Sequence, residues 1–521
     1  MLRKTVSAIM IMLILLFMDV SQLSCGIQFT ETQHTWMMFH HDPARTGFTL
    51  SPAPLTNETL WTFDTGERVT TSPAVFDGKV FIGSMNNIVF AIDQFSGELI
   101  WSTQLYDRIF FSSPALGNEK LYIGTERKLY ALDIDTGKIL WTTHVGFFAE
   151  LSSPNIVGNK VFICTEDGVF AINSETGSVI WRYPVRTASS VAISDGLVFV
   201  SSLSSEEGSY VLALNQNDGT LVWIKFIEGM AGSFVGSPAV SDDRVFVPLI
   251  SSDSESGFIY AFDKHKGTII WQSIPIGITF STPAVAYGKV FVGSYDGNIY
   301  AFNETNGELI WSYKTDDRIQ FSSPAIASGM VFIGSDDNYV YCLNESNGKL
   351  IWKYKTEHCV VSSPAISDGI LYIGSIDGKI YAIATPVPTT VDIKPDTLNL
   401  KSRVKWVIAY IELPEGYNVS DINVSSILLN NTIPVDLNAP MAIGDYDNDT
   451  IPDLMVKFNG TEVIKYILNN TNVTKLVEER FLTITLTLTG KLNDGTWFQG
   501  SDTIRIIMPI PRGIGKRIFP I

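Results

Sequence analysis

The chain has few of the residues on which many enzymes and small secreted domains depend. It contains four cysteines in 521 residues, with no adjacent pair and no C-x-x-C-H motif. This excludes a dense disulfide framework and covalently attached c-type haem. The six histidines form no H-E-x-x-H motif, and no G-x-S-x-G motif occurs. The signatures of zinc proteases and serine hydrolases are therefore missing.

Basic residues are also scarce. Thirty-seven Lys and Arg stand against 54 Asp and Glu, which gives a net charge of −17. Phosphate binding needs clustered Lys and Arg, so we expect no nucleic-acid partner. An acidic surface is compatible with a soluble, exported protein.

Long apolar runs are missing after the N-terminus. Residues 1–26 have the pattern of an export signal, with Arg3 and Lys4 before an apolar stretch over 6–18 and small residues at 24–26. The stretch is shorter than the ~20 residues of a membrane span. We expect an exported protein that is extracellular, at the cell surface or periplasmic, with no transmembrane span beyond the signal segment. An uncleaved anchor is the alternative.

Glycosylation sequons are frequent. An exported glycoprotein could carry glycans at such sites on surface loops, although chance in an Asn-rich chain also produces them. The ten sequons begin at Asn57, Asn303, Asn344, Asn418, Asn423, Asn430, Asn448, Asn459, Asn469 and Asn472.

What the chain has in abundance is an internal repeat. Seven copies place a small residue, an Asp or Asn two positions later, a Gly four further on and a Trp four beyond that, with a period of 40 to 48 residues. Such a period is typical of repeat architectures. The copies are Ala91-Asp93-Gly97-Trp101, Ala131-Asp133-Gly137-Trp141, Ala171-Asn173-Gly177-Trp181, Ala213-Asn215-Gly219-Trp223, Ala261-Asp263-Gly267-Trp271, Ala301-Asn303-Gly307-Trp311 and Cys342-Asn344-Gly348-Trp352.

Each copy predicts four short β-strands. In residues 323–354, four apolar runs rich in β-branched and aromatic residues are separated by three tight turns, which indicates an antiparallel sheet. Radial repetition covers both faces of such sheets, as in a β-propeller. The Gly permits positive φ in the last turn, and the Trp presents a flat face to the next blade with its N–H free for a carbonyl. Cys164 and Cys342 stand at small-residue positions, so we expect both to be buried; a bridge from Cys342 to Cys359 stays open.

Counting the units predicts how the ring closes. Eight first strands begin near Ser72, Ser113, Ser153, Ser190, Ser237, Thr282, Ser323 and Ser363, and eight outer strands carry Trp61, Trp101, Trp141, Trp181, Trp223, Trp271, Trp311 and Trp352. The first Trp precedes the first full unit, and the last unit ends at Ala382 without a Trp. We therefore expect the Trp61 strand to complete the last sheet and to close eight blades.

The best-kept copy, Ala131-Leu132-Asp133-Ile134-Asp135-Thr136-Gly137-Lys138-Ile139-Leu140-Trp141, resembles the PQQ-like repeat. Quinoprotein alcohol dehydrogenases share this repeat with the periplasmic scaffold lipoprotein of the outer-membrane β-barrel assembly machine. The resemblance covers about Trp36 to Ala384. It implies pyrroloquinoline quinone (PQQ) and Ca²⁺ at the axis in the dehydrogenases, commonly with an adjacent Cys-Cys disulfide. This chain has no adjacent cysteines, so we do not expect PQQ.

The domain organisation follows from where the repeat begins and ends. We expect an export signal over 1–26, an N-terminal arm over 27–55, the propeller over 56–384, a linker over 385–390, a β-sandwich over 391–510 and a tail over 511–521. The fold class is thus all-β: an eight-bladed propeller of four-stranded antiparallel blades, followed by a C-terminal β-sandwich-like domain. A short helix near 463–468 is also expected. In the arm, residues 40–42 (His-His-Asp) either bind a metal or pack structurally.

One acidic loop in the C-terminal domain indicates a metal site. Asp445, Asp447, Asp449 and Asp453 stand at relative positions 1, 3, 5 and 9 of a tight loop, a pattern that suits Ca²⁺ and resembles integrin-type and dockerin-type calcium loops. Thr450 replaces the usual Gly at position 6, and no Glu stands at position 12. A plain acidic turn is the alternative to structural Ca²⁺.

The sequence favours a binding role over catalysis. Loops that lead from an outer strand to the next first strand gather at one mouth of a propeller, where aromatic and charged residues suit an envelope or extracellular protein or glycan. We expect an exported, non-enzymatic binding or scaffold protein, with a PQQ-dependent oxidoreductase as the alternative. The mouth itself could also be a solvated rim that binds nothing. The candidate mouth residues are Arg108, Phe110, Phe148, Glu150, Phe234, Arg318, Gln320 and His358. No catalytic residue is assigned.

Overall fold

The fold is described from a computed structural model of the chain. The structure describes residues 35–187, 189–202, 208–231, 236–252, 256–471, 475–476, 479–493 and 496–508. These described residues belong to one compact unit. The predicted export signal and the predicted tail lie outside the described residues, as do residues 27–34 of the predicted arm.

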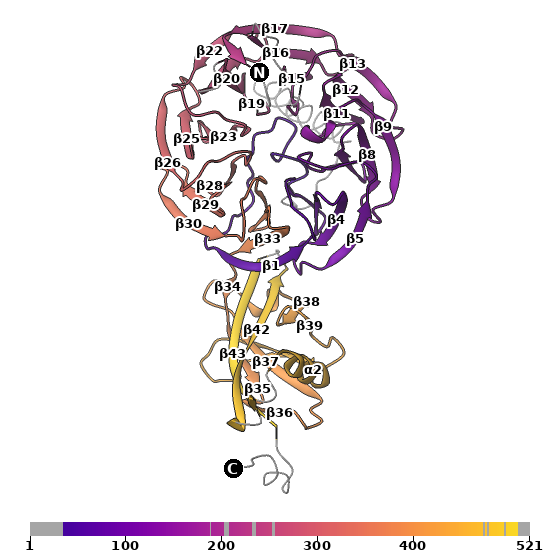
Figure 1. Cartoon of the computed structure of the whole chain (residues 1–521). Helices are drawn as coiled ribbons and strands as arrows, with labels where there is room; N and C mark the ends of the chain where they lie inside the picture. The colour runs from indigo at the N-terminus through magenta and orange to yellow at the C-terminus, as the bar shows by residue number, and fades with distance from the viewer. Residues whose placement is uncertain are drawn as a thin grey trace, which may run out of the picture. The chain divides into compact units, whose positions relative to one another are not determined.

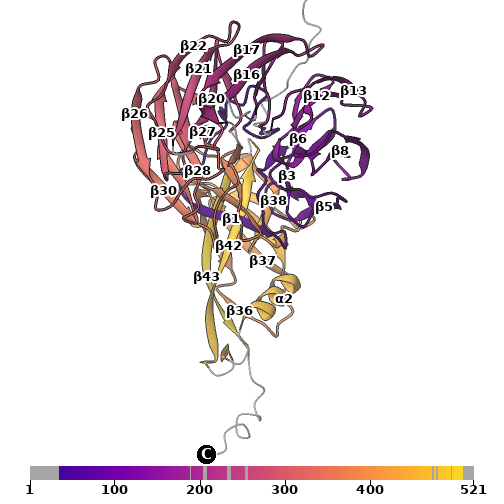
Figure 2. The ribbon, with the colours of Figure 1, turned by 45° about the horizontal axis from the view of Figure 1, so that its top comes forward.

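Eight β-sheets follow one another around an axis in the order of the chain (Figures 1 and 2). The first six comprise β2 (Ala74–Phe76), β3 (Lys79–Gly83), β4 (Ile88–Asp93) and β5 (Leu99–Gln104); β6 (Ala115–Gly117), β7 (Lys120–Gly124), β8 (Lys128–Asp133) and β9 (Ile139–His144); β10 (Asn155–Val157), β11 (Lys160–Thr165), β12 (Gly168–Asn173) and β13 (Val179–Tyr183); β14 (Ala192–Ser194), β15 (Leu197–Ser201), β16 (Gly208–Asn215) and β17 (Leu221–Glu228); β19 (Ala239–Ser241), β20 (Arg244–Ser251), β21 (Gly257–Asp263) and β22 (Ile269–Gln272); and β23 (Ala284–Ala286), β24 (Lys289–Gly293), β25 (Asn298–Asn303) and β26 (Leu309–Lys314). The fifth of these also pairs with the two-residue β18 (Met230–Ala231).

The last two blades show how the ring is closed. Blade seven holds β27 (Ala325–Ala327), β28 (Met330–Gly334), β29 (Tyr339–Asn344) and β30 (Leu350–Lys355). Blade eight holds β31 (Ala365–Ser367), β32 (Ile370–Gly374) and β33 (Lys379–Ala384), and its fourth strand is β1 (Glu58–Asp64) from the other end of the array. In Figure 1 the indigo β1 lies beside the orange β33. The predicted eight blades and their closure by the Trp61 strand are therefore confirmed.

The closing strand keeps the register of the repeat. In the other blades the small residue lies opposite the Trp, as Ala131 lies opposite Trp141, and in blade eight Ala382 lies opposite Trp61. The Trp61 Nε1 donates to the Gln94 carbonyl of blade one at 3.0 Å. Gly97 takes φ +73°, and a Cβ there would lie 2.7 Å from the Trp61 ring. The Gly therefore serves both the turn and the packing of the neighbouring Trp.

The two cysteines that occupy small-residue positions of the repeat are buried, as expected. Cys164 and Cys342 are fully buried. Cys342 and Cys359 are both free, so the bridge that the sequence left open is not formed.

The end of the N-terminal arm is packed inside the ring. Backbone atoms of residues 36–52 bond to the first strand, or the turn after it, in all eight blades; examples are Leu116 N to Met37 O at 2.8 Å and Ile326 N to Gly47 O at 2.7 Å. His40 is buried, and its ring nitrogens lie 2.7 Å from the Arg45 carbonyl and 2.9 Å from the Pro324 carbonyl. Burial lowers the pKa of His40 to about 4, against the pull of these carbonyls. Of the two interpretations offered for residues 40–42, metal binding or structural packing, these contacts favour packing.

The C-terminal region is built from two sheets over a shared apolar core. One contains β34 (Val387–Pro388), β36 (Thr397–Asn399), β38 (Ile422–Leu429), β39 (Ile433–Pro434), β42 (Phe481–Leu492) and β43 (Trp497–Ile507); the other contains β35 (Thr390–Lys394), β37 (Trp406–Glu412), β40 (Ala442–Gly444) and β41 (Asp453–Asn459). The expected helix is present as α2 (Gly460–Asn470), and two short 3-10 turns are η1 (Ala149–Leu151) and η2 (Val419–Asp421). Within the described ranges, no helix has the length and apolarity needed to cross a bilayer.

The predicted linker over 385–390 differs from the structure. Val387 and Pro388 pair in parallel with Phe498 and Gln499 of β43, and Thr390 begins β35, so half of this segment belongs to strands. Proline suits such an edge position because it has no N–H to donate. Pro-rich composition alone did not separate an edge strand from a connector.

Candidate functional site

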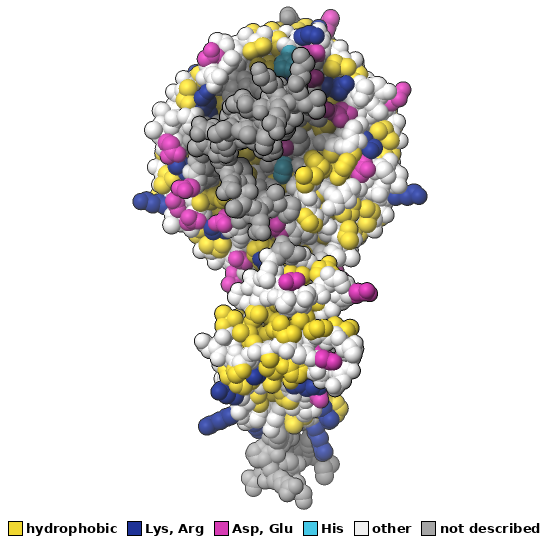
Figure 3. Space-filling model, turned by 180° about the vertical axis from the view of Figure 1, so that it is seen from behind, with side chains coloured by type: hydrophobic (Ala, Val, Ile, Leu, Met, Phe, Trp, Pro, Cys, Tyr) yellow, Lys and Arg dark blue, Asp and Glu magenta, His cyan; other side chains and the backbone are white. Residues whose placement is uncertain are grey.

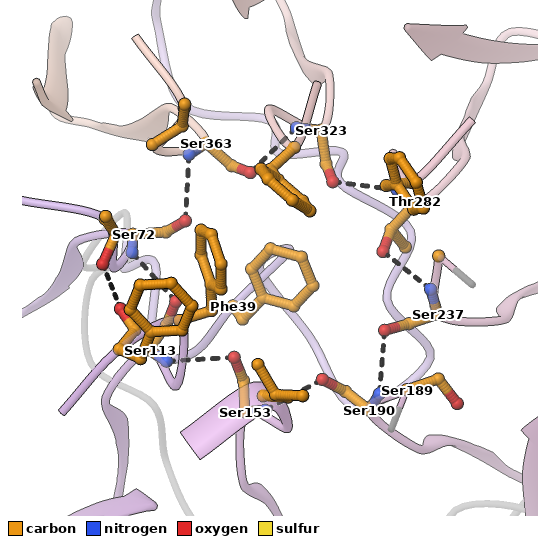
Figure 4. Close-up of a pocket in the computed structure, with 18 of the residues that line it drawn as sticks. Phe39, Ser72, Ser113, Ser153, Ser189, Ser190, Ser237, Thr282, Ser323 and Ser363 are labelled. Atoms are coloured by element: carbon orange, nitrogen blue, oxygen red, sulfur yellow. Dashed lines mark hydrogen bonds between the residues drawn. The ribbon is translucent and has the colours of Figure 1, made fainter. Parts of the chain in front are cut away.

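A ring of eight hydroxyl groups surrounds the propeller axis. The residue two positions before each first strand is Ser, or Thr in blade six, and its backbone N–H donates to the hydroxyl oxygen of the equivalent residue in the next blade (Figure 4). The eight bonds are 2.8–3.1 Å long and return to their start. We call these residues the hydroxyl ring: Ser72, Ser113, Ser153, Ser190, Ser237, Thr282, Ser323 and Ser363.

The preceding hydroxyls have a different task. Ser112 and Ser322, for example, accept the N–H of Gly124 and Gly334 inside their own blades, both at 2.9 Å. The Ser112 hydroxyl also donates to the Ser152 carbonyl before blade three at 2.8 Å. Both hydroxyls of a Ser-Ser-Pro segment can therefore link neighbouring blades, but it is the second one that forms the closed circle of eight bonds.

The hydroxyl ring lines an axial cavity of about 400 Å³. One end is covered by the arm, from which Phe39 reaches into the ring (Figure 4). The residues two positions before the ring form a second layer, here called the collar: Thr70, Phe111, Leu151, Phe280, Phe321 and Val361. In the blades that contribute to the collar, the chain passes from the collar residue to the ring residue and then to the first strand and its turn, where the arm is bonded. The collar and the arm therefore lie at opposite ends of the axis.

The three phenylalanines of the collar and Phe110, which lies beside them, form what we call the aromatic rim of the mouth. Phe110 lies 4.3 Å from Phe111, Phe111 lies 4.5 Å from Phe321, and Phe321 lies 5.4 Å from Phe280, measured between ring centroids. All four are half-buried. Such an edge, apolar and partly wet, is typical of surfaces that receive another molecule.

Two arginines of the mouth are held by acidic and aromatic neighbours. Arg108 lies 3.6 Å from the Glu150 carboxylate and 5.0 Å above the Phe110 ring. Glu150 is 4 % exposed, one of its oxygens has no partner in the described part of the chain, and burial raises its pKa. The sequence proposed Glu150 as a contact residue, but the structure turns its side chain inward.

The second arginine has a similar setting in blade seven. Arg318 Nε donates to Asp336 at 2.7 Å, and its guanidinium lies 4.8 Å from the Tyr295 ring. Asp336 is 8 % exposed, and its burial raises its pKa although Arg318 opposes this. Both arginine side chains keep about half of their surface in solvent, at 54 % and 43 %.

The other mouth residues proposed from the sequence differ in their position relative to the cavity. Gln320 lines the cavity together with Phe110. Phe148 is half-buried in a left-handed conformation at the start of η1, and His358 is exposed and accepts the Cys359 N–H. Phe234 lies outside the described residues. The hydroxyl ring, Phe39, Phe111, Phe280 and Phe321 were not proposed from the sequence.

The acidic loop of the C-terminal region gathers its carboxylates. Carboxylate oxygens of Asp445, Asp447 and Asp453 lie within 4.8 Å of one another, and those of Asp447 and Asp449 lie within that range of Glu412. Burial and the neighbouring acids raise the pKa of Glu412 and Asp453. Glu412 was missed because it reaches the loop only through the pairing of β37 with β41, where it stands opposite Asp453.

Position 6 of that loop keeps the expected backbone. Thr450 takes φ +80°, the left-handed region that glycine favours. The absence of Gly therefore does not change the path of the turn. The loop brings together oxygen ligands of the type that Ca²⁺ prefers.

The fold and the axial geometry define a PQQ-like repeat β-propeller. The sequence matches the family described as outer membrane protein assembly factor BamB over residues 50–206, 207–327 and 317–386, and the chain belongs to that family. No match was found among curated proteins.

Solved structures share the fold. BamB from Moraxella catarrhalis is 21 % identical, with a TM-score of 0.54 over 63 % of this chain and 100 % of that one. A europium-containing methanol dehydrogenase is 13 % identical, with a TM-score of 0.58 over 68 % and 99 % of the two chains. Quinohemoprotein alcohol dehydrogenase from Comamonas testosteroni is 15 % identical, with a TM-score of 0.56 over 67 % and 80 %. These similarities establish the fold but not the function, because one fold can carry several unrelated functions.

Proposed function

We propose that this chain is an exported, non-enzymatic binding or scaffold protein of the cell envelope, and that its propeller mouth holds a partner protein. The aromatic rim carries the proposal, because four half-buried phenylalanines surround the opening of an axial cavity. Arg108 and Arg318 add exposed, charged edges to this apolar centre. Apolar centres with polar rims are the usual anatomy of protein interfaces.

The family supports an envelope location. Its description names an outer-membrane assembly factor, and residues 1–26 have the pattern of an export signal. On the face shown in Figure 3, Lys and Arg side chains lie scattered among acidic ones. This distribution suits a protein or glycan partner better than a nucleic acid.

The alternative, a quinoprotein oxidoreductase, is less compatible with the residues at the axis. PQQ carries three carboxylates, and the Ca²⁺ beside it needs charged oxygen ligands. The described residues that line the cavity include no Lys, Arg, Asp, Glu or His. These residues do not fit the cofactor, so we derive no redox step through it.

The mouth is tested by pull-down from cross-linked envelope of the source cell. We expect the Arg108→Ala/Arg318→Ala variant to lose at least about three quarters of the partner that the wild type recovers, since interface arginines at such rims commonly contribute about 1 kcal/mol or more each. Arg182→Ala is the matched control, because Arg182 also contacts an acid, Asp167 at 3.6 Å, and an aromatic ring, Phe170 at 5.3 Å, but on the outer strand β13. Equal recovery by all three proteins would remove the mouth as the binding site.

We also propose that the acidic loop holds a structural Ca²⁺. Asp447 belongs to both carboxylate groups, so Asp447→Asn should remove most of the site. We expect millimolar Ca²⁺ to stabilise the wild type by roughly 2–3 kcal/mol if its concentration is about 100 times Kd, and to leave Asp447→Asn unchanged in thermal unfolding. Glu415→Gln, at an exposed acid outside the groups, is the control. A shift of the same size in Asp447→Asn would refute the site.

A further inference from the structure

The hydroxyl ring has hydrogen-bonding capacity that the fold does not use. Each ring oxygen accepts one backbone N–H from the adjacent blade, and all eight side chains are nine-tenths or more buried, at 1–5 % exposure. In the described part of the chain, none of these eight hydroxyls donates a hydrogen bond. The fold thus supplies a circle of buried donors at the axis, all of them lining the cavity.

Accepting an N–H also prepares these hydroxyls to donate. Chains of hydrogen bonds polarise their members, so an oxygen that accepts one bond makes its own proton a better donor. A buried donor without an acceptor is unfavourable. A molecule that brings acceptor oxygens to the ring would therefore be stabilised there.

The layer above the ring is apolar. The collar side chains Phe111, Leu151, Phe280, Phe321 and Val361 enclose the space between ring and mouth, and the hydroxyl of Thr70, the remaining member, already donates to the Phe110 carbonyl. The cavity volume, about 400 Å³, lies at the lower end of the range for small-molecule sites. No described lining residue carries a charge, so a charged ligand would lose its hydration without compensation.

We propose that the axial cavity binds a small uncharged molecule with an apolar body and a carbonyl or ether oxygen. The apolar body packs against the collar, and the oxygen accepts protons from the hydroxyl ring. This site shares Phe111, Phe280 and Phe321 with the aromatic rim. It goes beyond the proposed function, because it lies inside the axis and needs neither the partner nor the arginines of the mouth.

The test uses purified protein and three probes of similar size in isothermal titration. 4-Phenyl-2-butanone carries an apolar body and one carbonyl, butylbenzene lacks the acceptor, and 4-phenylbutanoate carries a charge. We expect one molecule of the ketone to bind per chain. Butylbenzene should bind at least about fivefold more weakly than the ketone, and the carboxylate at least about 100-fold more weakly.

A cavity-filling variant locates the binding. Leu151→Trp places an indole in the collar and should abolish ketone binding, whereas Leu140→Trp, the same change at a side chain 43 % exposed on β9, should leave it unchanged. Circular dichroism confirms that both variants fold. Three results would overturn the proposal: no binding of the ketone, equal binding of butylbenzene or of the carboxylate, or ketone binding that persists in folded Leu151→Trp.

Discussion

Trp61→Ala should lower the free energy of unfolding by about 3–5 kcal/mol, the range for removal of a buried aromatic side chain. Trp61 is 7 % exposed, packs on Gly97 of blade one and lies 5.8 Å from the Tyr372 ring of its own blade. Its loss also leaves the Gln94 carbonyl without the indole donor. Thermal and urea unfolding measure the change.

The control separates ring closure from simple loss of an indole. Trp181→Ala removes a side chain of similar burial, 8 % exposed, and a similar bond, 3.2 Å to the Gln216 carbonyl. Its strand stays covalently attached within its own blade, whereas β1 is held to β33 only by pairing. We therefore expect faster proteolysis near residues 50–57 in Trp61→Ala alone. Deletion of residues 56–66 with no change in thermal midpoint would show that β1 does not close the ring.

Arg45→Met should destabilise the chain by a similar amount, about 3–5 kcal/mol, because it leaves several buried acceptors unpaired. Arg45 is fully buried, and burial lowers its pKa to about 9. Its guanidinium donates to the carbonyls of Val191 at 2.8 Å, Ser153 at 2.9 Å, Pro154 at 3.3 Å and Phe39 at 2.5 Å. One side chain thus ties the arm to blades three and four.

Arg45→Lys is the matched control, since it keeps the charge but not the planar fork of five N–H donors. We expect a loss smaller than that of the Met variant, because one ammonium satisfies some but not all of the four carbonyls. Denaturant unfolding of both variants measures this. A change below about 1 kcal/mol in Arg45→Met would mean that the arm is not held by this residue.

The propeller could be predicted from the sequence because its determinants are local and repeated. Gly137 and Trp141 have equivalents in the other copies of the repeat, and their spacing fixes the hairpin that contains them. The closure was predictable for a related reason. The last unit lacks a Trp, and Trp61 stands alone before the first, so the two incomplete ends match.

The axial site could be predicted only in part. Each ring hydroxyl is visible in the sequence before the first strand, but its bond to the next blade depends on residues about 40 positions away and on the ring being closed. The collar has no single residue type, since Thr70, Leu151 and Phe280 occupy equivalent places. Arg45 gave no signal either, because its acceptors at Ser153 and Val191 lie more than 100 residues away. Glu412 joined the acidic loop through strand pairing alone.

We propose that this member of a PQQ-like repeat family is a binding protein and not a quinoprotein. The most direct test incubates the purified full chain with PQQ and Ca²⁺ and separates the mixture by gel filtration. We expect all quinone absorbance to elute in the small-molecule volume. Quinone that co-elutes with the protein at about one per chain would contradict it.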